Sequence, residues 1–175
     1  MRDLVRGTII ASVLVVLSAA APATKDDNWF GLFVELTKPV AAFLGNGRGT
    51  YFWKGGDIAD QAIAGMNNPR APIDLPNGNR LAWGCRPHSC MEMAGAIITP
   101  RNEVRAVALI HYPCVFGEVE FIFKCSHAAR LTIFVKRRDT DPAYSEAFEM
   151  WARREVAKLY PGDTFLTSVE TKVLP

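Results

Sequence analysis

One short segment in the middle of the chain combines residues that can do chemistry with residues that restrict a loop. It is Cys85-Arg86-Pro87-His88-Ser89-Cys90. A disulfide between its ends would draw two strand ends together and leave the four inner residues as a hairpin tip. Pro87 fixes its own φ and favours an extended Arg86. The segment therefore predicts a stiff protrusion with His88 at its apex and little conformational freedom to lose on binding.

An imidazole at such an apex has a definite chemistry. When protonated, it donates hydrogen bonds through both ring nitrogens. Its natural complement is a recess that holds two acceptors, such as the carboxyl pair about 5 Å apart in glycoside hydrolases that retain configuration. A single imidazolium from His88 could bond to both carboxylates, which would in turn favour its charged form.

The segment resembles the Cys-Lys-Pro-His-Asp-Cys loop of the inhibitor of vertebrate lysozyme (Ivy) family, periplasmic proteins of Gram-negative bacteria. The neighbouring sequence is also similar, over about residues 70–112, and residues 81–99 carry most of the likeness. The similar stretches are Leu75, Asn77-Gly78, Leu81 to Gly84, Met93 to Thr99 and Val104 to Ile110. The sequence after Tyr112 resembles the family weakly or not at all.

In that family, the loop enters the active-site cleft of a C-type lysozyme and its His contacts both catalytic carboxylates. The resemblance implies that His88 is the inhibitory group, that Pro87 shapes the loop, and that Cys85 and Cys90 close it. It also implies an antiparallel sheet with helices packed on it, and a homodimer, since homodimers are known in the family. The alternative is an inhibitor-like fold that binds an endogenous peptidoglycan-cleaving enzyme or another envelope partner.

Two loop positions depart from the family pattern. Arg86 stands in place of Lys, which keeps the charge but changes the donor geometry. Ser89 stands in place of Asp, which replaces a negatively charged acceptor with a neutral hydroxyl. The whole chain carries 20 basic and 18 acidic residues, a net charge of +2. With a net charge near zero, we expect slow association with a basic lysozyme.

The first residues have the pattern of a signal peptide. Arg2 and Arg6 flank a short leading region, an uninterrupted apolar run covers Thr8 to Leu17, and Ala21-Pro22-Ala23 offers a cleavage site. The run is shorter than the ~20 apolar residues of a membrane span. We expect a signal peptide at residues 1–23, a single domain at residues 24–175, and a periplasmic location without a membrane span. An N-terminal anchor helix is the alternative.

All four cysteines, Cys85, Cys90, Cys114 and Cys125, follow that segment, and an even number in an exported chain indicates disulfides. Three pairings are possible, and sequence proximity favours Cys85 with Cys90 and Cys114 with Cys125. A zinc site that also used His88 and His127 is the competing interpretation. However, the spacing matches no usual zinc unit, and four residues rather than two separate the first pair, unlike a thioredoxin-type site.

The remaining composition argues against other classes of protein. The near-balanced charge leaves no basic face for nucleic acid. The sequence contains no Gly-x-Ser-x-Gly, P-loop, His-Glu-x-x-His or GxGxxG motif at a strand-to-helix turn. We therefore expect no enzyme, no metal and no cofactor. His111, in an apolar strand, is interpreted as a core or sheet-surface residue.

The elements that must position the loop indicate an α+β fold: an antiparallel β-sheet, a meander of about five to six strands, with amphipathic helices packed on it. Short connections between β-rich runs in residues 72–136 demand antiparallel neighbours. Strands are expected at 51–53, 73–75, 80–85, 91–99, 104–112, 115–124, 130–136 and 164–173. Helices are expected from Trp29 with an end or kink at Pro39, from Asp57 to Met66, and from Pro142 to Pro161-Gly162.

Overall fold

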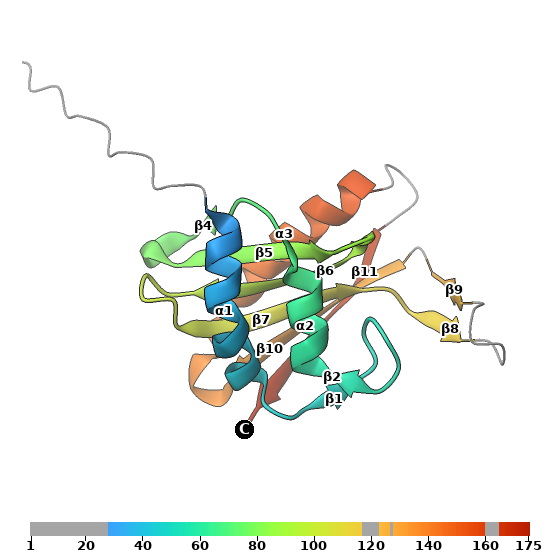
Figure 1. Ribbon diagram of the computed structural model, residues 1–175, viewed down its shortest axis with the longest axis horizontal. Coiled ribbons are helices and arrows are strands. Elements are labelled where there is room, and N and C mark those ends of the chain that lie inside the picture. Colours follow the sequence, from blue (N-terminus) through green and yellow to red (C-terminus); the bar gives the residue numbers. More distant parts are fainter. Residues whose placement is uncertain (1–27, 117–122, 127, 160–164) are drawn as a thin grey trace, which may run out of the picture.

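The computed structural model describes residues 28–116, 123–126, 128–159 and 165–175. The predicted signal peptide, residues 1–23, lies outside the described residues. The fold is α+β, as predicted, with a mostly antiparallel sheet (Figure 1). In chain order, the elements are α1 (Trp29–Leu44), β1 (Arg48–Gly49), β2 (Gly56–Asp57), α2 (Ile58–Met66), β3 (Asn68–Pro69), β4 (Ile73–Asp74), β5 (Arg80–Arg86), β6 (Ser89–Ile98), β7 (Val104–His111), β8 (Cys114–Phe116), β9 (Phe123–Cys125), β10 (Ala128–Lys136), α3 (Pro142–Leu159) and β11 (Phe165–Leu174).

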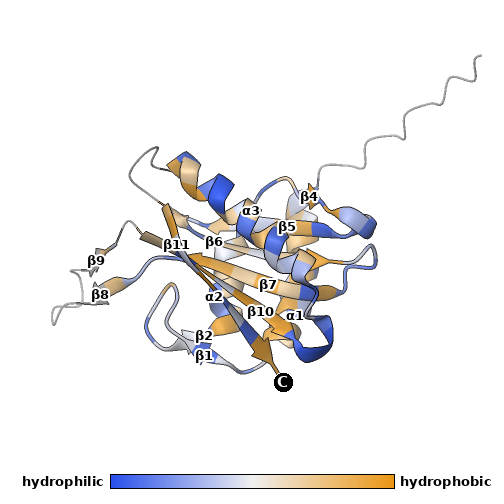
Figure 2. Ribbon diagram, turned by 180° about the vertical axis from the view of Figure 1, so that it is seen from behind, coloured by the Kyte–Doolittle hydropathy of each residue, from blue (hydrophilic) through white to orange (hydrophobic). Residues whose placement is uncertain are grey.

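The described residues form a seven-stranded main sheet in the order β11-β10-β7-β6-β5-β3, with β4 also paired to β5. Helices cover both of its faces. Since side chains alternate between the faces of a strand, Ala96, Leu109 and Phe134 pack under α1 and α2. Ile97, Ile110 and Ile133 face the other way and pack with α3. The central strands β7 and β10 are accordingly apolar along most of their length (Figure 2).

The helix expectations are confirmed in position, with one difference at Pro39. Asn28 caps α1 by accepting a hydrogen bond from the Gly31 amide, and the helix runs through Pro39 to Leu44. A proline inside a helix removes one backbone hydrogen bond. The buried side chains of Leu36 and Val40 anchor the helix on either side of that position, so α1 does not end there.

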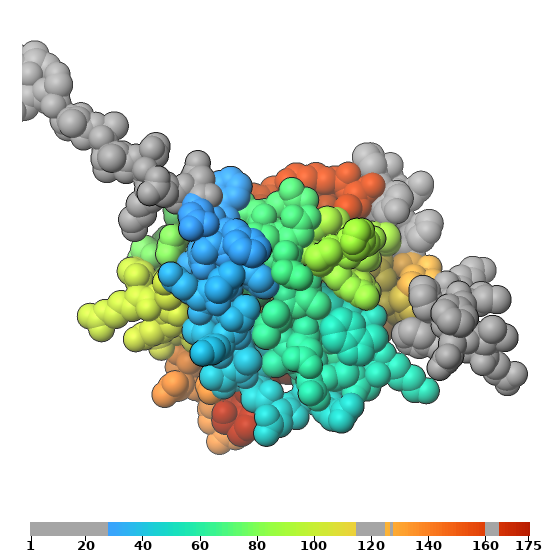
Figure 3. Space-filling model, in the orientation of Figure 1, coloured from blue at the N-terminus to red at the C-terminus, as the bar shows by residue number. Residues whose placement is uncertain are grey.

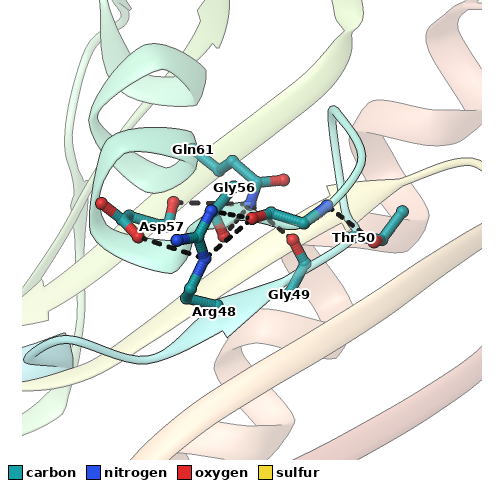
Figure 4. Close-up of polar contacts among 7 residues, drawn as sticks. Arg48, Gly49, Thr50, Gly56, Asp57 and Gln61 are labelled. Atoms are coloured by element: carbon teal, nitrogen blue, oxygen red, sulfur yellow. Dashed lines mark hydrogen bonds and ion pairs between the residues drawn. The ribbon is translucent and has the colours of Figure 1, made fainter.

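The strand expected at Tyr51 to Trp53 is wrong. These residues lie in an irregular loop, which we call the β1–β2 loop (residues 50–55). The fully buried side chain of Gln61, on α2, replaces the hydrogen bonds that a strand partner would supply, and Figure 4 shows its contacts with Gly49, Gly56 and Asp57. Its Oε1 accepts from the amides of Tyr51 (3.0 Å), Phe52 (2.7 Å) and Trp53 (3.4 Å), and its Nε2 donates to the carbonyls of Gly49 (3.0 Å), Gly56 (3.1 Å) and Asp57 (3.4 Å).

The C-terminal half differs from a simple meander in two places. The single strand expected at residues 115–124 is wrong, because its ends pair with each other as β8 and β9, with Val115 opposite Lys124. This small hairpin extends beyond the end of β7 (Figure 1). The last strand, β11, pairs parallel to β10, and α3 lies between the two in the chain, as a parallel crossover requires. Within the described ranges, no helix is long and apolar enough to cross a membrane.

Candidate functional site

The Cys85–Cys90 segment forms the tip of the β5–β6 hairpin. Arg86 pairs with Ser89 across the two strands, so Pro87 and His88 are the two residues of the turn. His88 has a φ of 64°, and a proline followed by a residue of positive φ is the requirement of a type II turn. Positive φ is uncommon for residues other than glycine. His88 is exposed at the apex, the position that the sequence predicted.

The disulfide closes the tip at its base. Cys85 is bonded to Cys90, with Cα atoms 4.7 Å apart. In the ladder, Cys85 stands opposite Met93 while the next residue, Arg86, stands opposite Ser89. Three extra residues of β6 therefore bulge out between these pairs. The bulge brings Cys90 back to Cys85 and directs the tip away from the regular sheet.

The base of the tip also rests on β3. Asn68 pairs with Cys85 in the ladder, and its Nδ2 lies 3.4 Å from the Cys85 sulfur. Gly84 allows this close approach, because a Cβ at that position would lie 2.6 Å from the Met66 carbonyl oxygen and 2.8 Å from that of Asn68. The disulfide is thus held between β3 and β6, and Cys85 is buried.

Arg86 folds back onto the protein and does not extend toward solvent with His88. Its Nη1 lies 2.6 Å from Oε2 of Glu92, in the bulge of β6. Its Cζ lies 5.5 Å from the centre of the Trp53 ring, close enough for a cation–π contact. The charge of Arg86 is therefore balanced within the hairpin, and His88 is the tip residue whose functional group stands exposed.

The tip borders a groove of about 420 Å³. One wall is the turn with His88, and the opposite walls are the β1–β2 loop and the β8–β9 hairpin. Phe52 and Trp53 line it from the first, and Cys114 and Cys125 from the second. Figure 3 shows the tip, in yellow-green, above the teal residues of the β1–β2 loop. His88 and the partly exposed Trp53 therefore border the same groove.

The second disulfide joins Cys114 to Cys125, directly opposite each other in β8 and β9. All four cysteines are therefore paired as sequence proximity indicated. The described part of the chain brings together no group of three or more His, Cys, Asp or Glu side chains that could share a metal. His127, the other histidine of the zinc interpretation, lies outside the described residues.

The sequence interpretation missed Trp53, Glu92 and Gln61 as supports of the tip. Glu92 is only two residues from Cys90, so its reach back to Arg86 could have been foreseen. Trp53 reaches Arg86 from more than thirty residues away, through a loop whose shape Gln61 determines. No local pattern in the sequence indicates that contact.

We find no family model, no curated protein and no solved structure that matches this chain. The resemblance of residues 70–112 to the lysozyme-inhibitor family therefore stays a prediction from the sequence.

Proposed function

We propose that this protein inhibits a C-type lysozyme by inserting the Cys85–Cys90 tip into the enzyme's catalytic cleft, with His88 between the two catalytic carboxylates. The observation that carries the proposal is the exposed His88 at a disulfide-closed, positive-φ turn. The protein has no catalytic activity of its own under this proposal, and it acts in the periplasm after removal of residues 1–23.

Rigidity supports this role. The disulfide, the proline and the Arg86–Glu92 ion pair restrict the tip before binding, so little ordering entropy is lost when it enters a cleft. The imidazole then supplies two hydrogen-bond donors in its protonated form. Carboxylates about 5 Å apart can accept both.

A second candidate is binding to an endogenous peptidoglycan-cleaving enzyme. Two observations favour it: Ser89 offers no negative charge to a cationic enzyme, and Arg86 is balanced internally by Glu92. If the vertebrate-type target is correct, Ser89→Asp should raise affinity for a basic C-type lysozyme severalfold at low salt, chiefly through faster association. If the endogenous enzyme is the target, the substitution should leave lysozyme binding undetectable, and a periplasmic pull-down should recover a native peptidoglycan hydrolase.

A lysis assay tests the leading proposal. Oxidised protein is added to a C-type lysozyme digesting bacterial cell walls, beside the variant His88→Asn. Asparagine tolerates positive φ, so this change removes the imidazole and keeps the turn. We expect inhibition at micromolar-order concentrations, and a loss on the order of tenfold or more in the variant, the size of a lost hydrogen bond to a charged group.

The matched control is Asn77→Gly, which alters another positive-φ turn residue at the opposite end of β5 and keeps that φ accessible. It should inhibit as the unaltered protein does. Equal inhibition by the unaltered protein and His88→Asn would remove His88 from its proposed role, and no slowing by either would contradict the function itself.

A further inference from the structure

A second polar region lies on the face of the sheet that α1 and α2 cover, toward the β10–β11 edge. We call it the basin and define it by Tyr51, His111, Arg130, Thr132, Ser168 and Lys172, which line a cavity of about 280 Å³. It takes one residue from the β1–β2 loop and the others from β7, β10 and β11. A neighbouring cavity of about 210 Å³ shares Tyr51, His111 and Arg130 with it.

The strand register brings these side chains together. Arg130 stands opposite His111 of β7 on one side and opposite Ser168 of β11 on the other. Residues two apart on a strand share a face, so Thr132 follows Arg130, and Lys172 lies on the same face of β11 as Ser168. Tyr51 closes the basin from the loop, with its ring edge-on to His111 at 5.0 Å between centroids.

The basin carries an excess of positive charge. Arg48, Arg130 and Lys172 are the cationic residues that line it, and Glu170 is the one carboxylate of the lining. Arg48 is already committed, since its guanidinium donates to the Gly55 carbonyl and lies 3.7 Å from Asp57. Arg130 is exposed and has no ion-pair partner among the described residues. Its guanidinium is thus free to bind an anion.

The pKa values of Lys172 and His111 are shifted in this environment. Lys172 donates to the Tyr51 hydroxyl at 3.1 Å, and that hydrogen bond raises the pKa of Lys172. Its pair with Glu170, at 3.6 Å and exposed on both sides, is weak. Burial, followed by the charges of Arg130 and Lys172, lowers the pKa of His111 to about 4. His111 is therefore neutral at physiological pH and adds no further cation to the basin.

We propose that the basin binds a dianionic oxyanion, a phosphate or a phosphate monoester. Arg130 and Lys172 together offer two positive charges, which suit a dianion better than a singly charged carboxylate. The planar fork of Arg130 suits two phosphate oxygens, and Lys172 supplies a point charge. The hydroxyls of Ser168 and Tyr51 offer further donors. The volume is several times the ~30 Å³ that one water occupies in the liquid, enough for phosphate with a small ester group.

This assignment is independent of the proposed inhibition. Tyr51 lines the basin and Trp53 lines the groove beside the tip, so the two sites lie on different parts of the β1–β2 loop. His88→Asn should consequently leave anion binding unchanged.

The test is a titration followed by amide chemical shifts and calorimetry at constant ionic strength. Inorganic phosphate, glycerol phosphate and acetate are compared with the unaltered protein. We expect saturable shifts at Tyr51, His111 and Ser168 with either phosphate, and at least fivefold weaker binding of acetate. Tighter binding of glycerol phosphate would identify the natural ligand as an ester, and tighter binding of inorganic phosphate would identify the free anion. Acetate binding as tight as phosphate would overturn the dianion assignment.

Arg130→Gln should weaken phosphate binding at least tenfold, and Lys172→Gln should weaken it by a smaller factor. The matched control is Arg137→Gln, an exposed arginine that follows the far end of β10, which should bind phosphate as the unaltered protein does. If either basin variant fails to fold, the other still decides the question. Equal binding by Arg130→Gln, Lys172→Gln and Arg137→Gln, or no saturable shift in the unaltered protein, would overturn the proposal.

Discussion

The tip takes all its residues from one hairpin, whereas the basin takes its residues from a loop and three strands far apart in the chain. The tip is closed covalently within six residues, and its shape depends on Cys85, Pro87 and Cys90. The basin exists only if β7, β10 and β11 pair in one register. The comparison shows why a local motif can be recognised from sequence while a site of comparable size elsewhere in the same protein cannot.

The β1–β2 loop connects the two regions, since Tyr51 lines the basin and Trp53 supports the tip. Gln61 positions both through their backbone amides. A change in Gln61 should therefore affect both the tip and the basin. A change confined to the tip or to the basin should affect only that region.

The largest effect is expected from Gln61→Ala. The side chain is fully buried, and its removal leaves backbone donors and acceptors of the loop without partners. Each unsatisfied buried group costs about 1–3 kcal/mol, so we expect a loss of at least about 3 kcal/mol in the free energy of unfolding, measured by urea denaturation. Both lysozyme inhibition and phosphate binding should weaken. A loss below about 1 kcal/mol would show that the loop holds its shape without Gln61.

The next effect concerns the basin alone and depends on pH. Because the pKa of His111 is lowered from 6.5 to about 4 in the folded protein, its contribution to stability is present above pH 6.5 and is lost as pH falls toward 4. This shift of the His111 pKa corresponds to a change of about 3 kcal/mol in the free energy of unfolding. Arg130, Lys172 and the Tyr51 ring face the imidazole, and Thr132 Oγ1 lies 3.0 Å from its Nε2.

His111→Gln should reduce this acid sensitivity, because glutamine keeps a hydrogen-bonding group near Thr132 and does not titrate. The measurement is the free energy of unfolding from pH 7.5 to 4, compared between the two proteins so that the carboxylates common to both cancel. Parallel pH profiles would contradict the account of His111.

The two disulfides should separate stability from function. Chain-entropy arguments assign about 2 kcal/mol to the Cys85–Cys90 closure and about 3 kcal/mol to the longer Cys114–Cys125 closure. We therefore expect the double variant Cys114→Ser/Cys125→Ser to unfold at a slightly lower urea concentration than the double variant Cys85→Ser/Cys90→Ser. The double variant Cys85→Ser/Cys90→Ser should lose more of the inhibition, while phosphate binding stays unchanged in it. The reverse order in the lysis assay would mean that the β8–β9 hairpin carries the contact.

Sequence patterns predicted the elements that are defined by hydrophobic periodicity and by capping or turn residues at their ends. Examples are α1 after Asn28, α3 from Pro142 and the hairpin that presents His88. They failed where long-range contacts replace local ones. Gln61 holds Tyr51 to Trp53 in a loop despite their β propensity, and β8 pairs with β9 within a segment whose β propensity predicts one strand. The basin could not be predicted, because Arg130 and Lys172 line one cavity only through the parallel pairing of β10 and β11.

The central claim is that the tip occupies the cleft of its target, and competition tests it most directly. The dissociation constant for a C-type lysozyme is measured with the cleft empty and with a chito-oligosaccharide filling it. The account predicts that the oligosaccharide displaces the inhibitor and that His88→Asn binds at least tenfold more weakly to the empty enzyme. Binding that is equally tight with the cleft filled would contradict it.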